Sequence, residues 1–482
     1  MQAILVAAVV AAAASLGRGA ALAPASRPTL AAAIGAGSEG ACALTTAGGA
    51  KCWGYNGEDQ LGTGQQGLVA SSVPVDVSGL RTGVAALAVG VRHSCALMSA
   101  GGVKCWGMAD LGELGDGTAQ RRLAPVDVVG LSSGVKAVAA GVASSCALTG
   151  AGGVKCWGSN NQGQVGDGTT TNRSAPVDVV GLSGVTAITA NCALMSAGGV
   201  KCWGGSYGLA PVDVFAPGSG IVAITHGCAL TSAGGVKCWG PNNQGQVGDG
   251  TRVDRPVPVD VLGLTGGVTA VSAWGGHGCA LLSSGGVKCW GVNDFGQVGD
   301  GTTIDRTAPV AVAGLSAGVA AISAGVLQTC ALMRSGAVEC WGASGAGQLG
   351  DGSSVTTHAN RFRSTPVGVV GLGPHATVTI ASRSVTVTPA RVAAVSVRCG
   401  APAPCHGTLV LTEAGARLGT GRFSIPASSV RPVVVRLSIR AVALVSRVRQ
   451  LSVQARASYE QAPGVTVSTM RTITLTAATS RR

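Results

Sequence analysis

The 482-residue sequence is poor in aromatic and charged residues, which make up 3% and 11% of the chain. Helix-forming residues such as Glu, Lys, Gln and Met are also sparse, whereas Val, Thr, Leu and Ala dominate. This composition argues against a largely helical protein and favours strands joined by turns, for which the 77 glycines are suited. It also leaves valine, leucine and a few tryptophans to fill the core.

Catalytic motifs are absent as well. The sequence contains no HExxH, P-loop or GxSxG motif, and its Asp-Gly-Thr loops lack the alternating carboxylates of an EF-hand. Six histidines are scattered along the chain without a repeated acidic or nucleophilic neighbour. Cysteines in the close CxxC spacing of zinc sites are missing too. We therefore expect no enzyme activity, no catalytic residue, no metal and no cofactor.

Long hydrophobic runs are limited to the N-terminus. Residues 4–16, ILVAAVVAAAASL, are too few to span about 30 Å of hydrocarbon as a helix. Ala21-Leu22-Ala23 follows as a small-residue cleavage site, so the sequence predicts a signal peptide over residues 1–23 and a secreted or cell-surface protein. A short N-terminal anchor is the alternative, because no positive charge precedes the run. No later stretch is apolar enough for a transmembrane segment.

Cysteine, in contrast, is plentiful and regularly spaced. Seven copies of a motif such as CALMSAGGVKCWG recur at intervals of 36 to 53 residues. In a hairpin centred near Ala100, Cys95 faces Cys105 with Cα atoms about 4.5 Å apart, which is within disulfide geometry. The sequence therefore predicts one disulfide per hairpin and one near the C-terminus; zinc ligation and free buried thiols are the alternatives. The predicted pairs are Cys42 and Cys52, Cys95 and Cys105, Cys146 and Cys156, Cys192 and Cys202, Cys228 and Cys238, Cys279 and Cys289, Cys330 and Cys340, and Cys399 and Cys405.

Each repeat offers four short strands, as in residues 134–140, 144–148, 154–158 and 175–180. Four-stranded sheets repeated radially leave only short protected edges. The repeats therefore predict a seven-bladed β-propeller over residues 31–373.

The units resemble repeats of the regulator of chromosome condensation family. The resemblance rests on Ala-Leu, a glycine hairpin, Trp-Gly and then Gly-Gln-Leu-Gly, as at residues 347–350, and it covers roughly residues 31–373. It implies a seven-bladed propeller that acts as a protein-interaction platform; one nuclear member is a nucleotide exchange factor, and a secreted bacterial member inhibits β-lactamases. The export signal makes a secreted bacterial member the expected kind. The chain departs from the family in its paired cysteines, and only three repeats have a histidine two positions before the first cysteine, at His93, His226 and His277.

Two further residue types recur in every repeat or nearly so. The repeated tryptophan has the same position in each unit, which predicts a core residue rather than a ligand-stacking one. The lysine before the second cysteine is predicted to pair with an aspartate of the fourth strand, with a functional basic ring as the alternative. The tryptophans are Trp53, Trp106, Trp157, Trp203, Trp239, Trp290 and Trp341.

The repeats lose residues at one end of the predicted propeller. The loop after Trp203 shrinks to residues 204–209, and the turns before Cys192 and Cys228 are short. Aromatic residues outside the motif gather in turns and loops of this same end. Because exposed aromatics beside a notch are typical of binding hot spots, we predict a site for a protein or glycan partner here; local packing after repeat decay is the alternative. The predicted site residues are Tyr55, Tyr207, Trp274, Phe295 and Phe362.

Composition changes after residue 374. Short alternating segments between Gly, Pro and Ser turns predict an immunoglobulin-like β-sandwich over residues 376–479. From His375 onward there are fourteen arginines, no lysine and two glutamates, so this part carries +12 of the net charge of +13. Such charge suits an anionic envelope polymer, whereas nucleic acid is not expected because interleaved aromatics are missing. A merely solvated arginine-rich surface is the alternative.

Together these features predict an all-β, secreted or cell-surface interaction scaffold that binds its partner through one end of the propeller, without catalysis. We expect a monomer. An inhibitor of a secreted or periplasmic enzyme is one alternative. A guanine nucleotide exchange factor-like regulator is another, if the chain stays inside the cell. A hydrolase or lyase that uses the propeller funnel is disfavoured by the lack of a catalytic carboxylate cluster.

Overall fold

A computed structural model describes residues 29–353, 361–373, 378–388, 390–399, 405–425, 429–462 and 465–478. The predicted signal peptide, residues 1–23, lies outside the described residues. The chain forms two compact units, Met1–Gly373 and Pro374–Arg482.

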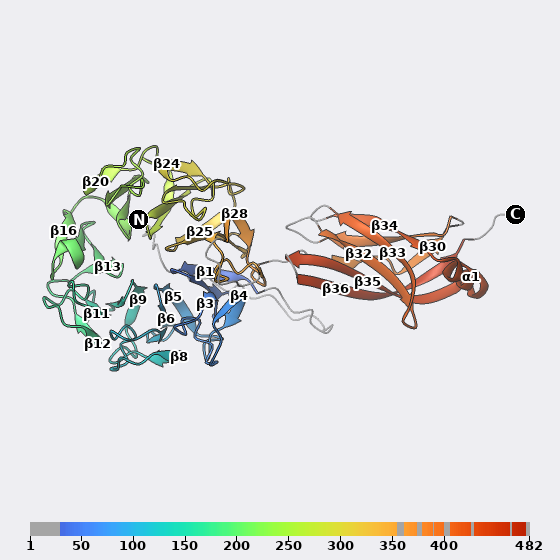
Figure 1. The fold of residues 1–482 in the computed structure, drawn as a ribbon, viewed down its shortest axis with the longest axis horizontal. Helices are drawn as coiled ribbons and strands as arrows, with labels where there is room; N and C mark the ends of the chain where they lie inside the picture. Colours follow the sequence, from blue (N-terminus) through green and yellow to red (C-terminus); the bar gives the residue numbers. More distant parts are fainter. Residues whose placement is uncertain are drawn as a thin grey trace. The chain divides into compact units, whose positions relative to one another are not determined.

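The first unit is a ring of seven four-stranded antiparallel sheets, which confirms the seven-bladed propeller (Figure 1). The four strands of every blade are consecutive in the chain, and the first strands contact one another in turn around the ring. Blade 1 consists of β1 Ala31–Ala36, β2 Gly40–Thr45, β3 Ala50–Tyr55 and β4 Ala70–Asp76, and blade 2 of β5 Val84–Val89, β6 His93–Met98, β7 Val103–Gly107 and β8 Arg122–Asp127. Blade 3 consists of β9 Val135–Ala140, β10 Ser144–Thr149, β11 Val154–Gly158 and β12 Arg173–Asp178, and blade 4 of β13 Val185–Ile188, β14 Cys192–Met195, β15 Val200–Cys202 and β16 Val212–Phe215. Blade 5 consists of β17 Ile221–Thr225, β18 Cys228–Thr231, β19 Val236–Gly240 and β20 Arg255–Asp260; blade 6 of β21 Val268–Trp274, β22 His277–Leu282, β23 Val287–Gly291 and β24 Arg306–Ala311; blade 7 of β25 Val319–Ala324, β26 Gln328–Met333, β27 Val338–Ala343 and β28 Phe362–Gly368.

The hairpin between the second and third strands has the register that the sequence predicts. In blade 2, Cys95 lies opposite Cys105. The turn of this hairpin needs glycine twice: Gly101 has a φ of 82°, and a Cβ at Gly102 would lie 2.7 Å from a backbone oxygen of the link that follows the blade. A side chain at either position would strain or displace the turn, so the glycine pair fixes the register of the flanking cysteines.

The core of the propeller lies between adjacent blades. Each cluster combines apolar residues of one blade with the motif tryptophan of the next, as where Trp157 of blade 3 packs with Leu114 and Val128 of blade 2. Six of the seven motif tryptophans are 0% exposed, and Trp239 is 7% exposed. The prediction that these tryptophans are core residues is confirmed, and their large apolar area holds neighbouring blades together.

The ring closes between blade 7 and blade 1 by side-by-side contact, without an exchanged strand. Trp53 of blade 1 belongs to the hydrophobic cluster of blade 7. The backbone N–H of Val326 donates to the carbonyl oxygen of Gly37 at 2.9 Å, and Thr29 forms a parallel bridge with Leu372. We call this junction the seam; it uses the same kinds of contact as the other blade junctions.

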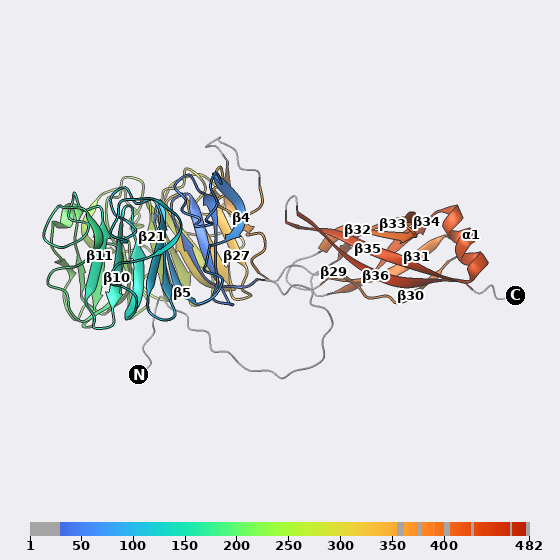
Figure 2. The ribbon, with the colours of Figure 1, turned by 90° about the horizontal axis from the view of Figure 1, so that it is seen from below.

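The described residues of the second unit form strands and one helix (Figure 2). Its strands form a single sheet in the order β29-β31-β30-β36-β35-β32-β33-β34, and an additional pairing of β31 with β34 closes seven of them into a barrel-like ring. The predicted immunoglobulin-like arrangement, which needs two separate sheets, is not confirmed. The elements are β29 Val378–Ile380, β30 Ser384–Val387, β31 Val392–Cys399, β32 Cys405–Glu413, β33 Ala416–Ile425, β34 Val430–Leu437, α1 Ile439–Val448, β35 Gln450–Ala462 and β36 Val465–Ala477.

The helix α1 is an element that sequence patterning missed, since only strands were expected in this unit. The Ser438 hydroxyl caps the helix by accepting a hydrogen bond from the N–H of Ala441 at 3.2 Å. Ala441 and Val445, one helical turn apart, are buried in the core of the unit. Among the described residues, no helix has the length and apolar character required to cross a membrane.

Candidate functional site

One end of the propeller carries two sets of links: those between the first and second strands of each blade, and those between the third and fourth. We call this end the loop face. A hollow of about 850 Å³ opens on it across blades 3 to 6. The walls come from residues 141–144, 159, 161, 162 and 164 of blade 3, 190–192 and 203–207 of blade 4, 226–228, 239–241 and 246 of blade 5, and 273–277 of blade 6.

The hollow coincides with the residues that blade 4 has lost. In blade 3 the loop from β11 to β12 spans residues 159–172 and buries Val165. In blade 4 the corresponding loop spans only residues 203–211 and is built around the short 3-10 helix η1, Gly205–Tyr207. The strands of blade 4 are also only three or four residues long. The shortened blade therefore leaves space between its neighbours on the loop face.

Tyr207 supplies a hydrogen-bond acceptor that a backbone carbonyl group of the longer loop supplies at the other blade junctions. In six blades the indole N–H of the motif tryptophan donates to a backbone carbonyl oxygen in the loop of the preceding blade, at 2.8 to 3.0 Å. Blade 4 has no such loop, and Trp239 of blade 5 donates instead to the hydroxyl oxygen of Tyr207 at 2.6 Å. An unpaired buried N–H would cost about 1–3 kcal/mol, so Tyr207 has a structural task besides lining the hollow.

Histidines two positions before the first cysteine link neighbouring blades. His93 Nε2 lies 2.8 Å from Ser145 Oγ, and His277 Nε2 lies 2.8 Å from Thr329 Oγ1. Both hydroxyls donate to backbone carbonyl oxygens, so each accepts from the protonated Nε2 of a neutral imidazole. Burial lowers the pKa of His93 and His277 to about 4.

His226 departs from this pattern and opens onto the hollow. The position that Ser145 and Thr329 occupy in their blades is Gly278 in the blade after His226, so no hydroxyl is present there. The ring of His226 lies instead against Trp274, with the ring centroids 5.6 Å apart and the planes tilted by 33°. Its side chain reaches solvent within the hollow, yet the surrounding protein displaces enough water to lower the pKa of His226 below its usual value.

The structure brings together two of the five predicted site residues. Tyr207 and Trp274 are half-buried, and both line the hollow. Tyr55 and Phe295 are half-buried in blades 1 and 6 away from it, and Phe362 is 40% exposed at the start of β28. Sequence analysis missed the amide, serine and glycine residues of the walls, because they belong to ordinary repeat loops and nothing in the sequence marks them.

In five blades the lysine of the third strand pairs with an aspartate of its own blade. Lysines of the third strand lie 2.6 to 2.9 Å from aspartates of the fourth strand in five blades, which confirms the predicted cross-strand pairing. In blade 6 Lys288 faces Ala311, and in blade 7 Glu339 faces Gly368. The pairs are Lys51 with Asp76, Lys104 with Asp127, Lys155 with Asp178, Lys201 with Asp213, and Lys237 with Asp260.

A second charged network, which sequence analysis missed, fastens the Asp-Gly-Thr loops. In blade 3 Asp167 accepts hydrogen bonds from Arg173 Nε at 2.7 Å and from the N–H of Thr169 at 3.0 Å. Burial raises the pKa of Asp167, but the hydrogen bonds from Thr169 and Arg173 more than offset it and hold the pKa below its usual value. Equivalent arginine–aspartate bonds occur in blades 2, 5 and 6. The signal in the sequence of these four blades is an arginine six residues after the loop aspartate.

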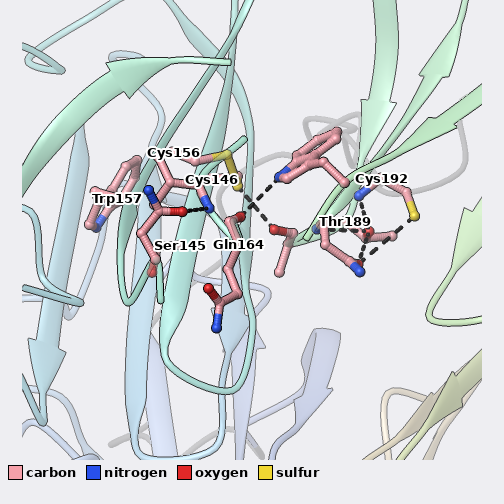
Figure 3. The surroundings of a disulfide bond; sticks show 12 residues. Ser145, Cys146, Cys156, Trp157, Gln164, Thr189 and Cys192 are labelled. Atoms are coloured by element: carbon pink, nitrogen blue, oxygen red, sulfur yellow. Dashed lines mark hydrogen bonds between the residues drawn. A yellow bond between two sulfur atoms is a disulfide. The ribbon is translucent and has the colours of Figure 1, made fainter. Parts of the chain in front are cut away.

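All sixteen predicted cysteines are joined as disulfides in the predicted pairs. The seven hairpin pairs have Cα atoms 4.0 to 4.1 Å apart, and Cys399 and Cys405 have theirs 5.8 Å apart. Figure 3 shows the bridge of Cys146 and Cys156 in blade 3, beside Trp157 and near Cys192 of blade 4. Among the described side chains, His, Cys, Asp and Glu nowhere cluster in groups of three that could hold a metal ion.

Comparison with protein families finds the regulator of chromosome condensation (RCC1) repeat at residues 51–97, 100–148, 151–199, 233–281 and 284–332. A second profile of the same description matches residues 84–113, 135–164 and 268–297. The matched segments leave out residues 200–232, which contain the shortened loop and His226.

Similar proteins include the ultraviolet-B receptor UVR8 of Arabidopsis thaliana, which is 27% identical over 63% of this chain and 62% of its own length. The E3 ubiquitin-protein ligase HERC2 of Homo sapiens is 30% identical over 65% of this chain and 6% of its own length. The chain thus spans less than two thirds of either relative. Among solved structures, Prp20p of Saccharomyces cerevisiae, described with its binding to Gsp1p and histones, has 20% identity and a TM-score of 0.42, covering 70% of this chain and 76% of its own. Human WBSCR16 has 21% identity and a TM-score of 0.43, covering 72% and 83%.

Proposed function

The chain belongs to the regulator of chromosome condensation (RCC1) repeat family, and from this premise we propose that it is a non-catalytic interaction module whose loop face binds a partner at the hollow. Members of the family act as protein-interaction platforms, which supports binding rather than catalysis. The apolar N-terminal run and the eight disulfides support a secreted or cell-surface location for this activity.

The observation that carries the proposal is the local change in the repeat. Only blade 4 has a shortened loop of this kind, and the hollow opens there. The aromatic rings of Tyr207 and Trp274 line it, and aromatic side chains in a concave surface are typical of the centre of a binding site. In blades 2, 5 and 6 the loop between the third and fourth strands keeps its Asp-Gly-Thr segment, and the aspartate of that segment is already paired with an arginine.

Affinity capture with the full mature chain tests the proposal. We expect the wild-type protein to retain a partner from envelope and culture-medium proteins at both low and high salt, and Trp274→Ala to lose it. Val69→Ala is the control, since Val69 is 65% exposed on the loop side of blade 1 and does not line the hollow. Retention of the same partner by Trp274→Ala would contradict the proposal.

The arginine-rich unit supports a second binding activity, for an anionic polymer. Eleven of its described arginines are exposed, against two glutamates in the sequence of this part of the chain. Arg398, Arg422 and Arg436 lie on the adjacent strands β31, β33 and β34, where a polymer with regularly spaced negative charges could contact all three. Such a contact would anchor an exported protein to an anionic envelope.

Binding of the full chain to long-chain polyphosphate tests this activity. We expect affinity to fall steeply with salt, and the triple variant Arg398→Ser/Arg422→Ser/Arg436→Ser to bind more weakly with a shallower salt dependence. The matched control, which removes the same charge from exposed arginines of the propeller, is Arg81→Ser/Arg92→Ser/Arg334→Ser. Equal weakening by both variants would show that only net charge matters and would contradict a site on this unit.

A further inference from the structure

We propose that the hollow on the loop face binds a neutral saccharide, such as the terminal rings of an uncharged glycan. The inference rests on the proposed function, because it names the chemical class that the same site accepts. Four properties of the hollow carry it: the charge of its walls, its aromatic rings, its polar side chains and its size.

No charged residue is found among the described residues that line the hollow. None of the 28 residues that line it is Asp, Glu, Lys or Arg. The two histidines in the walls, His226 and His277, are neutral near pH 7, because the surrounding protein displaces water from both rings and lowers their pKa below its usual value. A ligand with phosphate, carboxylate or ammonium groups would lose hydration here without gaining a counter-charge. Nucleotides, acidic sugars and amines are therefore disfavoured, and neutral ligands are favoured.

Trp274 offers a flat apolar surface of the kind on which the C–H face of a sugar ring packs. The ring of His226 lies against it, which fixes the indole from one side. The residue ends β21, and the next two residues, Gly275 and Gly276, turn the chain with φ values of 61° and 99° that other residues rarely adopt. The turn and the histidine thus hold the indole in place before any ligand arrives, and such preorganisation favours binding.

The polar side chains of the walls are amides and hydroxyls. Gln164 is already engaged, since its Nε2 donates to Asn161 Oδ1 at 2.9 Å and its Oε1 accepts from the backbone of the same loop. Gln162 and Ser206 are exposed, and neither side chain is hydrogen-bonded to another described residue. An amide presents donors and an acceptor in one plane, which matches the alternating donor and acceptor character of neighbouring sugar hydroxyls.

The size of the hollow favours a small ligand. Its volume of about 850 Å³ falls within the range of about 300–1,000 Å³ that small-molecule sites occupy. A protein partner would need about 800 Å² of contact from each side, more than the hollow alone supplies. One or two sugar rings attached to a larger molecule would fit within it, whereas a neutral peptide loop is the competing occupant.

Titration of the full mature chain with neutral disaccharides tests the inference. The probes are maltose, cellobiose, lactose and N,N′-diacetylchitobiose, followed by tryptophan fluorescence and by ligand-observed NMR, with glucuronic acid and glucosamine as charged comparisons. We expect at least one neutral sugar to bind and both charged sugars to bind more weakly. Trp274→Ala should weaken the binding by about tenfold, and Gln162→Ala by a smaller factor. Val69→Ala should leave it unchanged.

The outcomes separate this inference from the proposed function. In one outcome the protein captures a partner through Trp274, but none of the sugars binds to the protein or competes with that partner. This outcome would overturn the saccharide inference and leave the proposed interaction module standing. Competition by a neutral peptide alone would overturn it in the same way. Loss of both sugar binding and Trp274-dependent capture would overturn both. Sugar binding that survives Trp274→Ala would place the sugar outside the hollow and contradict the inference.

Discussion

The hydroxyl group of Tyr207 contributes to the contact between blade 5 and blade 4. Trp239 has no loop carbonyl to donate to, and Tyr207 supplies the acceptor from the 3-10 helix η1. Phe215 of blade 4 meets the same indole edge-on, with the ring centroids 5.5 Å apart. Tyr207 is therefore part of the packing between blades as well as part of the wall. A variant that removes only its oxygen separates these two roles better than an alanine does.

We expect Tyr207→Phe to lower the free energy of unfolding by about 1–3 kcal/mol, because it leaves the Trp239 N–H buried without an acceptor. The measurement is urea unfolding followed by tryptophan fluorescence. Tyr55→Phe is the matched control, since its hydroxyl is not hydrogen-bonded to another described residue. Equal stability of the two variants would show that water replaces the lost oxygen.

The buried histidines make the stability of the propeller depend on pH. His93 and His277 have a pKa of about 4 when folded against an ordinary value of 6.5, so the unfolded chain binds more protons between these values. Stability is fully present above pH 6.5 and falls as the pH drops towards 4, by on the order of 3 kcal/mol per histidine. Urea unfolding between pH 7.5 and 4.5 measures the slope.

His277→Gln tests that assignment, since blade 7 carries glutamine at the same position, as Gln328. The variant should lose a large part of the acid-side slope while remaining folded at pH 7.5. A slope identical to that of the wild type would assign the acid sensitivity to other groups.

At the scale of elements, each blade has its own covalent fastening. A disulfide across each hairpin closes an eleven-residue loop, which the chain-entropy treatment values at about 2–3 kcal/mol. A short blade can therefore remain folded with less packing than its neighbours. Blade 4 is such a case, because its strands span three or four residues and still include the Cys192–Cys202 bridge. We infer that the hairpin disulfide keeps blade 4 folded although its loop is shortened, and that the shortened loop leaves the hollow open.

Restoring the lost loop should close the hollow. A variant in which residues 241–254 of blade 5 replace residues 205–211 of blade 4 would supply the Gln-Val-Gly-Asp-Gly segment and a carbonyl acceptor for Trp239. We expect equal or greater thermal stability and loss of partner or sugar binding. A graft of the same segment in place of residues 108–121 of blade 2, which do not line the hollow, is the control. Binding that survives the blade 4 graft would place the site elsewhere.

Much of this architecture could be predicted from local sequence, because each blade carries the same short sequence motif. The Cys-to-Cys spacing and the Gly-Gly turn fix the hairpin register, and the motif tryptophan marks the junction between blades. The hollow was predicted only as a notch with five aromatics, of which Tyr207 and Trp274 line it. The role of Tyr207 could not be predicted, since it depends on an indole N–H that lies 32 residues away. The closing pairing of β31 with β34 is likewise a long-range contact, and α1 was hidden by a predominantly β composition.

At the scale of the whole propeller, stability depends on how well the last blade fits the first. Gly325 of blade 7 sits against the carbonyl oxygen of Gly37 of blade 1, so closely that a Cβ would collide with it. The backbone hydrogen bond from Val326 to Gly37 lies next to this contact. Any side chain at Gly325 therefore pushes the two ends of the ring apart.

We expect Gly325→Ala to destabilise the propeller by about 1–3 kcal/mol through this overpacking. Gly368→Ala in the same blade is the control, because no atom lies within 4 Å of the Cβ it would add. Thermal unfolding followed by circular dichroism compares the two. Equal melting temperatures would show that the seam accommodates the added methyl group without loss of stability.

The seam has a consequence for where the propeller begins. All seven blades are built from consecutive strands, and Thr29 lies beside Leu372. The ring therefore depends on the order of the blades, but not on which blade comes first in the chain. A circularly permuted propeller that joined residue 373 to residue 29 and opened between two other blades would keep all seven blades, their seven hairpin disulfides and the packing at each blade junction. A ring of this kind can also lengthen or shorten by duplication or loss of whole blades, because no strand is shared between them.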